Sequence, residues 1–307
     1  MRASILDPAG TAAAEIATLF WWMTAGSVVV WLLAVGLGLY CARGRRLPHP
    51  ERFVWGLILG GGVIVPSLLL SVLLYFGLRP LTRVQAASPE ATTIAVAGEQ
   101  WWWRVRYTLP DGTTVDAANE LRLPVGHRTA VALASDNVLH AFWIPALAGK
   151  VDMVPGRATR VVLEPTTVGV FRGACAEYCG TSHARMDFRA EVMSAGAFDA
   201  WLGGQAADAI PADSVEARRG AALFTWHGCG ACHAVRGTAA AGTIGPDLTH
   251  VGSRPSLATA SMRNAPAEMA AWLAAPDQTK PGAHMPGFAM VGGDDLRALA
   301  AYLTGLR

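Results

Sequence analysis

The chain has 307 residues, which is room for two ordinary domains, and its formal net charge is +2. A charge so close to neutrality gives no electrostatic reason to expect a nucleic acid as a partner. Hydrophobic residues make up 52% of the chain and charged residues only 16%, which is unusual for a soluble protein and indicates a membrane part.

Two uncharged segments, 16–41 and 53–78, lie near the start of the chain. Each exceeds the roughly 20 residues that cross a bilayer as an α-helix, and each carries Trp and Tyr near its ends, as interfacial anchors do. The sequence therefore predicts a membrane anchor over residues 1–90, with transmembrane helices at about 16–42 and 53–78. A buried soluble hairpin or a cleaved signal peptide fits segments of this length less well.

Arginines near the helix ends predict the orientation of the anchor. The loop between the two helices carries more of them than the outer ends do: Arg43, Arg45, Arg46 and Arg52 against Arg2, Arg79 and Arg83. The positive-inside rule then places the loop in the cytoplasm. Both termini, and everything after residue 78, are expected outside the cytoplasm.

From about residue 91 to 196 the hydrophobic pattern changes to a period of two. The runs "TTIAVAG", "RVRYTL", "TAVALAS", "TRVVLEP" and "DFRAEV" alternate or are β-branched, and turn residues separate them. Asp111-Gly112 is typical of a hairpin turn. The segment is therefore predicted to form an all-β sandwich or barrel.

Residues 197–213, which include "GGQAADAIPAD", are predicted to be a linker. A small all-α domain is expected over residues 214–307. Ser214 would cap its first helix, and the closing helix places Leu296, Leu299 and Leu303 on one face.

The helical segment contains the motif C-x-x-C-H at Cys229, Cys232 and His233. Two thiols at this spacing can both add to the vinyl groups of one haem, and the following imidazole can then bind the iron. Met285, in "GAHMPGF", is the expected sixth ligand. Met290 is its main rival, since helical packing is expected for two other methionines, Met262 and Met269. A redox dithiol or half of a zinc site are the alternatives for the cysteine pair.

The pieces "CGACH", "GPDL" and "MPGF" stand in the order found in class I cytochrome c, which the last 90 or so residues resemble. The resemblance implies a covalent haem c and places Pro246 near His233. Because haem is attached covalently outside the cytoplasm, it also implies the same location for this domain as the arginines do.

Four potential metal ligands lie within twelve residues in "CAEYCGTSHARM": Cys175, Cys179, His183 and Met186. A zinc site would need a second histidine and has no use for the methionine. A disulfide is possible but leaves His183 and Met186 unexplained. Thiolate, imidazole and thioether together suit a copper electron-transfer centre, in which methionine is a weak ligand.

Two thiolates can bridge two copper ions, and each copper then needs its own imidazole. His140, in "SDNVLHAFWIP", is the candidate for the second imidazole. His127, in "VGHRT", competes for this role but has the surroundings of a turn residue.

The pieces "HAFWIP", "KVDMVPGR" and "CAEYCGTSHARM", behind two membrane helices, resemble subunit II of cytochrome c oxidase. The resemblance covers about residues 16–192 and implies a cupredoxin-like β-domain with the dinuclear copper centre CuA. Cys175 and Cys179 would bridge the coppers, and His140 and His183 would each bind one. The ligands implied beyond these four are Met186, the carbonyl of Glu177 and, for a Mg²⁺ at the interface with subunit I, the Glu177 carboxylate.

The three tryptophans of "GEQWWWRVRY" would alternate faces along a strand, so at least one must be exposed or face a partner. The resemblance makes Trp101 the residue at which electrons enter, above CuA, whereas Trp102 is equally well explained by packing. Glu51 stands near a family glutamate that serves a proton channel. The residues that follow are out of register, and no function is assigned to it.

A subunit II fused to a cytochrome c resembles the caa3-type oxidases. The resemblance implies a multi-pass protein of the bacterial inner membrane, with the copper and haem domains on the periplasmic side. An external donor, either cytochrome c or a membrane complex, would reduce the haem. Electrons would then pass through CuA to subunit I, where O₂ is reduced and protons are pumped. Subunits I and III and the lipid bilayer are the implied partners.

Two alternatives remain open and a third is excluded. A nitric oxide reductase that uses a CuA subunit would carry the same ligands, because its catalytic metals lie in another chain. A membrane-anchored electron carrier without an oxidase partner is also possible. A quinol oxidase subunit is excluded, because such subunits have lost the copper ligands.

Overall fold

The computed structural model describes residues 1–43, 49–85, 93–210 and 213–307. The chain divides into two compact units, one of residues 12–87 and one of residues 1–11 with 88–307. Arg45, Arg46 and the predicted domain boundary at residues 90–91 lie outside the described residues, as do the side chains of Arg79 and Arg83. The orientation of the anchor therefore stays a prediction.

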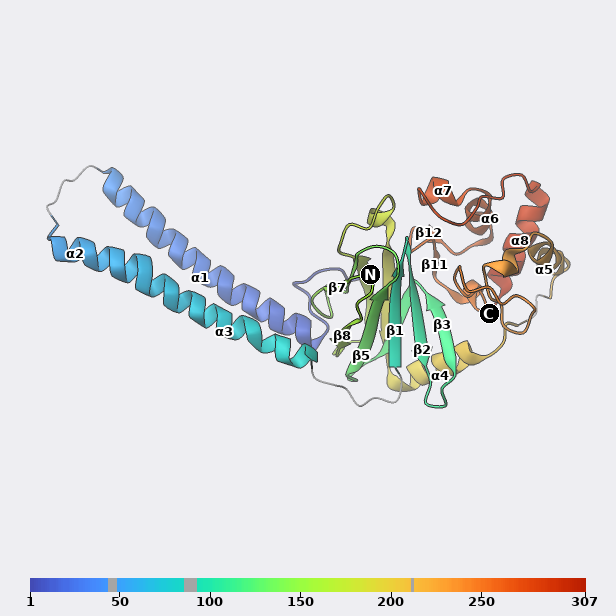
Figure 1. The fold of residues 1–307 in the computed structure, drawn as a ribbon, viewed down its shortest axis with the longest axis horizontal. Helices are drawn as coiled ribbons and strands as arrows, with labels where there is room; N and C mark the ends of the chain where they lie inside the picture. Colours follow the sequence, from blue (N-terminus) through green and yellow to red (C-terminus); the bar gives the residue numbers. More distant parts are fainter. Residues whose placement is uncertain (44–48, 86–92, 211–212) are drawn as a thin grey trace. The chain divides into compact units, whose positions relative to one another are not determined.

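Two long apolar helical segments form the first unit (Figure 1). α1 spans Thr11–Ala42, and the second segment consists of α2 (Glu51–Gly56), a π-helical stretch (Leu57–Ile64) and α3 (Val65–Gln85). By length and composition both segments can cross a membrane. Their large apolar side chains are exposed in this chain, as expected of helices whose surroundings are lipid.

The π-helical stretch has a local cause in the sequence. Pro66 has no N–H to donate, and its ring crowds the carbonyl of the residue four positions earlier, which is Gly62. Widening the helix just before the proline relieves this conflict, and Gly60 to Gly62 offer no side chains that would oppose it.

Ten strands form a sandwich of two five-stranded sheets, which we call the β-domain (Figure 1). β1 pairs in parallel with β5, and β10 pairs in parallel with β4; the other neighbours are antiparallel. The first sheet has the order β3 (Thr114–Ala118), β2 (Trp102–Thr108), β1 (Thr93–Glu99), β5 (Thr129–Ser135) and β8 (Thr159–Leu163). The second has the order β4 (Glu120–Pro124), β10 (Asp187–Met193), β9 (Gly169–Cys175), β6 (His140–Trp143) and β7 (Val151–Met153).

Aromatic side chains fill the space between the sheets. Alternate residues of β2 are buried, so Trp103 and Tyr107 face the core while Arg106 between them is exposed. The ring of Phe188 lies 5.1 Å from that of Trp103 and stacks on Phe142 at 4.9 Å, measured between ring centroids. This packing fixes the end of the second sheet at which the ligand-bearing loop begins.

A helix, α4 (Ala195–Ala206), occupies the first part of the segment that the sequence analysis assigned to a linker. The Ser194 hydroxyl caps this helix by accepting a hydrogen bond from the Ala197 amide, and Phe198 and Leu202 are buried. Gly203 and Gly204, which suggested a linker, lie in the last turns of the helix. The irregular connection therefore begins only at Ala207.

The helical domain, residues 213–307, packs around the crossing of its first and last helices. The Ser214 hydroxyl caps α5 (Val215–Trp226), as predicted, and Phe224 of this helix meets Tyr302 of α8 (Gly293–Gly305) edge to face. Met269 is buried, as expected, but Met262 lies in a strand and not in a helix. The other α-helices and strands of this domain are α6 (Pro266–Ala274), α7 (Pro276–Thr279), β11 (Ser256–Leu257) and β12 (Met262–Arg263).

Candidate copper and haem centres

The predicted metal ligands of the β-domain meet at one end of its second sheet. Cys175 is the last residue of β9, His140 is the first residue of β6, and the loop from β9 to β10 carries Cys179 and His183. The ladder between β6 and β9 pairs Phe142 with Cys175, which brings His140 close to this loop.

Each cysteine sulfur faces its own imidazole. Cys175 Sγ lies 3.7 Å from His140 Nδ1, and Cys179 Sγ lies 3.6 Å from His183 Nδ1. The two sulfurs are 3.8 Å apart, and both cysteines are free thiols rather than a disulfide. Ligand atoms of His140, Cys175 and Cys179 all lie within 4.8 Å of one another, a group that does not include His183.

Two further predicted ligands lie against the same sulfurs. Met186 Sδ is 3.7 Å from Cys179 Sγ, and the carbonyl oxygen of Glu177 is 3.1 Å from Cys175 Sγ. The Glu177 carboxylate has a different partner, the ammonium of Lys150 at 3.4 Å. His127, the competing histidine, is exposed, and its Nδ1 lies 3.1 Å from the Val125 carbonyl oxygen.

Surrounding side chains hold these ligands in position. The Asn137 side-chain oxygen lies 3.3 Å from His140 Nε2, which leaves Nδ1 as the free nitrogen toward Cys175. The Trp103 indole donates to the Met186 carbonyl at 3.1 Å. The loop is also held at Cys179, whose carbonyl accepts from the Trp101 indole at 3.0 Å and from the Gln100 amide at 2.8 Å.

The sulfurs interact strongly enough to shift each other's ionisation. The hydrogen bond from the Cys179 thiol lowers the pKa of Cys175 below its ordinary value. The pKa of Cys179 is raised, because its thiol proton is shared with the Cys175 sulfur. Together with buried imidazole and thioether groups, a thiolate formed in this way fits a soft metal ion such as copper.

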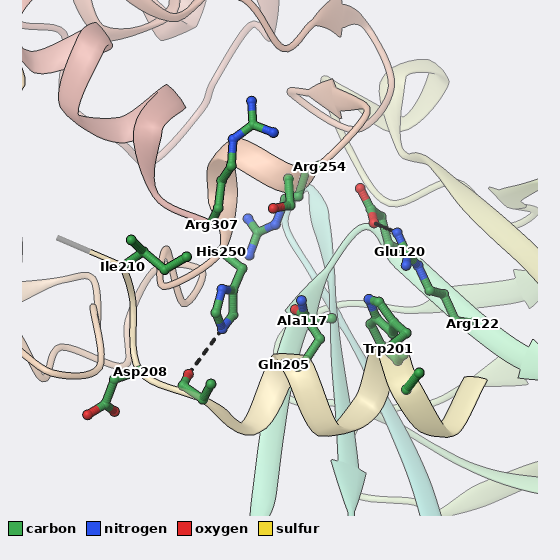
Figure 2. A pocket seen from close by; sticks show the side chains of 14 residues that line it. Ala117, Glu120, Arg122, Trp201, Gln205, Asp208, Ile210, His250, Arg254 and Arg307 are labelled. Carbon is green, nitrogen blue, oxygen red and sulfur yellow. Dashed lines mark hydrogen bonds and ion pairs between the residues drawn. The ribbon is translucent and has the colours of Figure 1, made fainter. Parts of the chain in front are cut away.

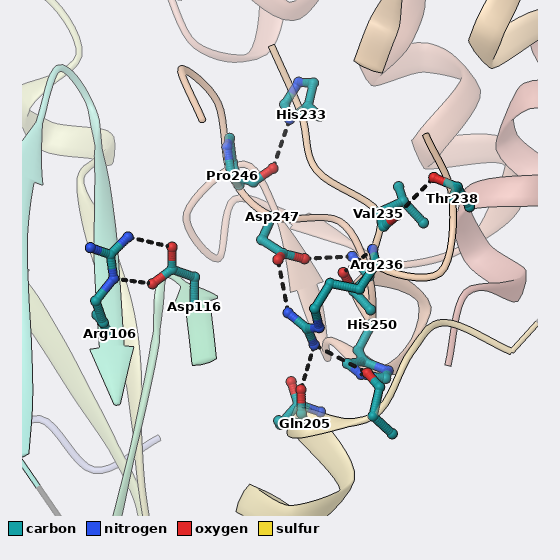
Figure 3. Close-up of polar contacts among 12 residues, drawn as sticks. Arg106, Asp116, Gln205, His233, Val235, Arg236, Thr238, Pro246, Asp247 and His250 are labelled. Atoms are coloured by element: carbon teal, nitrogen blue, oxygen red, sulfur yellow. Dashed lines mark hydrogen bonds and ion pairs between the residues drawn. The ribbon is translucent and has the colours of Figure 1, made fainter. Parts of the chain in front are cut away.

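The C-x-x-C-H motif lies in the helical domain at a short 3₁₀ turn, Cys229–Ala231. His233 Nδ1 donates to the Pro246 carbonyl at 2.8 Å, so the resemblance-based expectation that Pro246 lies near His233 is met (Figure 3). Burial lowers the pKa of His233, and the imidazole is therefore neutral near pH 7, the form that binds iron.

The close approach of Gly245 to His233 and an ion pair of Asp247 position the loop that carries Pro246. A Cβ added to Gly245 would lie 2.4 Å from His233 Cε1, so a larger residue has no room there. Asp247 forms an ion pair with Arg236 at 2.9 Å, and Arg236 also donates to the Gln205 carbonyl at the end of α4 (Figure 3). The motif "GPDL" is thus a close-packed support for the histidine and more than a surface turn.

The methionines of the helical domain differ in burial. Met285 is partly buried against the hydrophobic core of this domain, whereas Met290 is 82% exposed. Met262 Sδ accepts a hydrogen bond from the Thr279 hydroxyl at 3.5 Å. Partial burial beside the core favours Met285 over Met290 as a ligand.

The three consecutive tryptophans have three different surroundings. Trp103 is fully buried in the core, and Trp102 is half-buried beneath the Arg104 guanidinium, 4.6 Å from its ring centroid. Trp101 precedes β2 and is only 8% exposed, although it lies at the edge of the β-domain. The ring of His284, from the helical domain, lies 5.9 Å away from the Trp101 ring.

A cavity of about 490 Å³ lies elsewhere, between α4, β4 and the helical domain (Figure 2). Burial raises the pKa of Glu120 in its wall, and Arg122 and Arg254 also line it. None of the predicted metal or haem ligands is among its lining residues. The cavity is therefore separate from both candidate centres.

Sequence reasoning missed the contacts that the helical domain makes with the β-domain near Trp101. Lys280 is 5% exposed and donates to the Trp101 carbonyl and, at 2.9 Å, to the Thr259 hydroxyl. A single lysine between the end of α7 and Met285 forms no recognisable motif, so the sequence could not have indicated this contact.

Two family models match the chain. Residues 109–193 match the periplasmic domain of cytochrome c oxidase subunit II, and residues 217–307 match cytochrome c. A crystal structure of the periplasmic domain of subunit II of cytochrome oxidase from Bradyrhizobium japonicum is 30% identical. It covers 39% of this chain and 96% of that chain, with a TM-score of 0.35.

Relatives with the name cytochrome c oxidase subunit 2 support the same family. The protein of Alkalihalophilus pseudofirmus is 38% identical over 214 residues, and this match covers 70% of the present chain and 61% of the relative. The protein of Bacillus subtilis is 32% identical, and this match covers 74% of the present chain and 66% of the relative. The matches thus span somewhat less than two thirds of these relatives. The chain belongs to the cytochrome c oxidase subunit II family and carries a cytochrome c domain behind its subunit II domain.

Proposed function

We infer that this chain is subunit II of a caa3-type haem–copper oxidase and that it conducts electrons from its own haem c through a dinuclear copper centre toward subunit I. The proposed organisation is an anchor over 1–90, a copper domain over 91–196, a connection over 197–213, of which residues 197–206 belong to α4, and a haem domain over 214–307. The domain matches imply copper and haem c.

The arrangement of sulfur and nitrogen atoms carries the proposal of two coppers. A single tetrahedral ion needs its four ligands around one point. Here one imidazole faces Cys175 and another faces Cys179, and His183 stands outside the compact group that contains His140. Two sulfurs 3.8 Å apart, each with its own imidazole, support two metal positions on either side of the sulfur pair.

The residues around the centre have separate tasks in this proposal. Cys175 and Cys179 would hold both metals as thiolates, and His140 and His183 would hold one each. Met186 and the Glu177 carbonyl complete the set, and the buried aromatic core excludes water. Two coppers held by these residues would supply a centre that accepts and releases one electron.

In the haem domain the proposal assigns covalent attachment to Cys229 and Cys232. His233 is the proximal ligand, with Nδ1 bound to the Pro246 carbonyl, so that Nε2 is free to bind iron. Met285 would supply the second side-chain ligand of the iron. When bound, a haem with His and Met ligands supplies a one-electron carrier of high potential.

The remaining assignments concern the assembly. Trp101 is the route by which electrons reach the copper domain, and the Glu177 carboxylate, paired here with Lys150, is assigned to Mg²⁺ beside subunit I. The partners are subunits I and III, an external donor and the lipid bilayer. The two apolar helices support a membrane anchor, and we assign it to the bacterial inner membrane with both metal domains on the periplasmic side.

Metal analysis and electron paramagnetic resonance of the purified full chain test the proposal. Two coppers and one haem iron per chain are expected, with a copper resonance split by two equivalent nuclei. Zinc in the β-domain, or splitting by a single copper nucleus, would refute the bridged centre. Consumption of O₂ rather than NO by the complex purified in mild detergent would separate an oxidase from a nitric oxide reductase.

A further inference from the structure

A short segment of the helical domain, residues 279–284, lies against the β-domain beside the candidate copper ligands; we call it the docking loop. The buried Lys280 ammonium donates to the Trp101 carbonyl, across 179 positions in the sequence. Burying an amino group is costly unless it finds acceptors, and Lys280 has a second one in the Thr259 hydroxyl.

The loop that bears the copper ligands provides the other side of this contact. The buried Ser182 hydroxyl, next to His183, donates to the Pro281 carbonyl at 2.7 Å. Arg185 donates to the Thr279 carbonyl and accepts at its own carbonyl from the Thr259 hydroxyl. Every one of these bonds joins the helical domain to the segment between Cys179 and Met186.

The docking loop also covers the Trp101 ring. Gly282 has a φ of +78°, and a Cβ at this position would lie 2.9 Å from the indole of Trp101. Glycine therefore permits both the turn and the close approach. On its other side the indole donates to the Cys179 carbonyl. Trp101 is thus enclosed between a candidate copper ligand and the residues that immediately precede Met285.

We propose that the docking loop is an internal interaction surface that seats the haem domain on Trp101, with Lys280 as its positioning residue. A separate donor protein then cannot reach Trp101 to deliver electrons to the copper ligands. This inference rests on the proposed function, because it presupposes copper and haem in this chain. It implies that the copper receives electrons, one at a time, only from the attached haem. The tether favours the internal partner, because a linked domain has a far higher effective concentration than a free one.

Amine labelling of the full chain tests the docking without using any metal signal. The chain has two lysines, Lys150 and Lys280, and the Lys150 side chain is 47% exposed. An acylating reagent labels the two amines, and mass spectrometry measures the labelling rate of each. We expect Lys280 to react at least about tenfold more slowly than Lys150. Equal rates for the two lysines in a sample with an intact haem spectrum would overturn the proposal.

A pair of glycine variants shows whether protection of Lys280 comes from docking or from the helical domain alone. Gly282→Ala should collide with Trp101 and raise the labelling rate of Lys280 about tenfold. Gly112→Ala has a similar backbone angle, φ +85°, but no neighbouring atom within 4 Å, and it should leave that rate unchanged. An unchanged rate in both variants would contradict the proposal.

Electron transfer in Lys280→Met gives a second test. The haem is reduced by a light flash, and the rate of electron transfer from haem to copper is recorded from the change in copper absorption. We expect this rate to fall about tenfold or more in Lys280→Met, since small misplacements between reacting groups are costly. The copper resonance and the haem spectrum should not change, and the exposed-site control Arg263→Met should keep the original rate. An unchanged rate in Lys280→Met would overturn its positioning role. A chain without copper in which Lys280 is still protected would overturn the proposed function and leave the docking supported.

Discussion

His233 donates from Nδ1 to the carbonyl oxygen of Pro246, which lies thirteen positions later in the chain, over 2.8 Å. A carbonyl can only accept, so the proton stays on Nδ1 and the lone pair on Nε2. The bond therefore fixes both the tautomer and the orientation of the imidazole before any iron is bound.

Gly245→Ala should disturb this support. Its new Cβ would lie 2.4 Å from His233 Cε1, and relief would require a shift of the imidazole or of the loop. We expect the free energy of unfolding of the helical domain to fall by about 1–3 kcal/mol, the usual cost of overpacking, as measured by urea denaturation followed through the haem spectrum. Gly305→Ala, with open space around it, is the control and should not destabilise the domain.

Substitution of the two candidate methionines should give opposite results. Met285→Leu should lower the haem reduction potential and remove the far-red absorption of a methionine-bound ferric haem, because leucine has no ligand atom and the thioether that raises the potential is lost. Met290, which is 82% exposed, should tolerate the same change without effect on either signal. If Met290→Leu changed both signals and Met285→Leu changed neither, Met290 would be the iron ligand.

His140→Ala should abolish the copper signal shared by two nuclei and leave the haem spectrum intact. His140 is fully buried and its Nδ1 faces Cys175 at 3.7 Å, so no solvent ligand has a direct path to replace it. Electron paramagnetic resonance provides the measurement. His127→Ala, at an exposed turn, should keep the split signal, and unchanged splitting in His140→Ala would exclude it as a ligand.

Local sequence patterns predicted those parts of the fold whose physical cause is local. Alternation along "TAVALAS" matches β5, and the Asp111-Gly112 turn joins β2 to β3, with the Thr113 amide donating to the Asp111 carboxylate. The short strand β6 has no alternation, because three of its four residues are buried. The pattern therefore could not distinguish it from a loop. Sandwich and barrel also remained open, because sheet order depends on distant pairings.

The candidate copper site followed from the sequence for a similar reason. Cys179, His183 and Met186 lie on one loop, so spacing alone places them together. His140 lies far away in the sequence, and it was predicted as a ligand only because two coppers need two imidazoles. Its position beside the loop depends on the pairing of β6 with β9. The contact between Lys280 and Trp101 had no counterpart in the sequence, because it depends on how two domains pack, and no residue pattern encodes that packing.

Acidification should weaken the metal-free β-domain through its cysteine pair. The hydrogen bond from Cys179 lowers the pKa of Cys175 below the value of about 9 that an unfolded thiol has, so the folded state holds a thiolate at neutral pH. A lowered acid pKa contributes stability that is fully present above pH 9 and is lost as pH falls through the lowered value. The free energy of unfolding of the chelator-treated chain should therefore decrease as pH is lowered from 9.

Ultraviolet absorption of the thiolate gives the direct measurement for this last prediction. The metal-free chain should keep one thiolate band at neutral pH and lose it only in acid, and Cys175→Ser should remove the band together with part of the pH dependence of stability. Cys41→Ser is the matched control, since this exposed cysteine lies in α1 and has no sulfur partner among the described residues. A thiolate band that first rises near pH 9 would show that the two sulfurs do not share a proton. It would also remove the electrostatic reason for expecting this pair to capture metal at neutral pH.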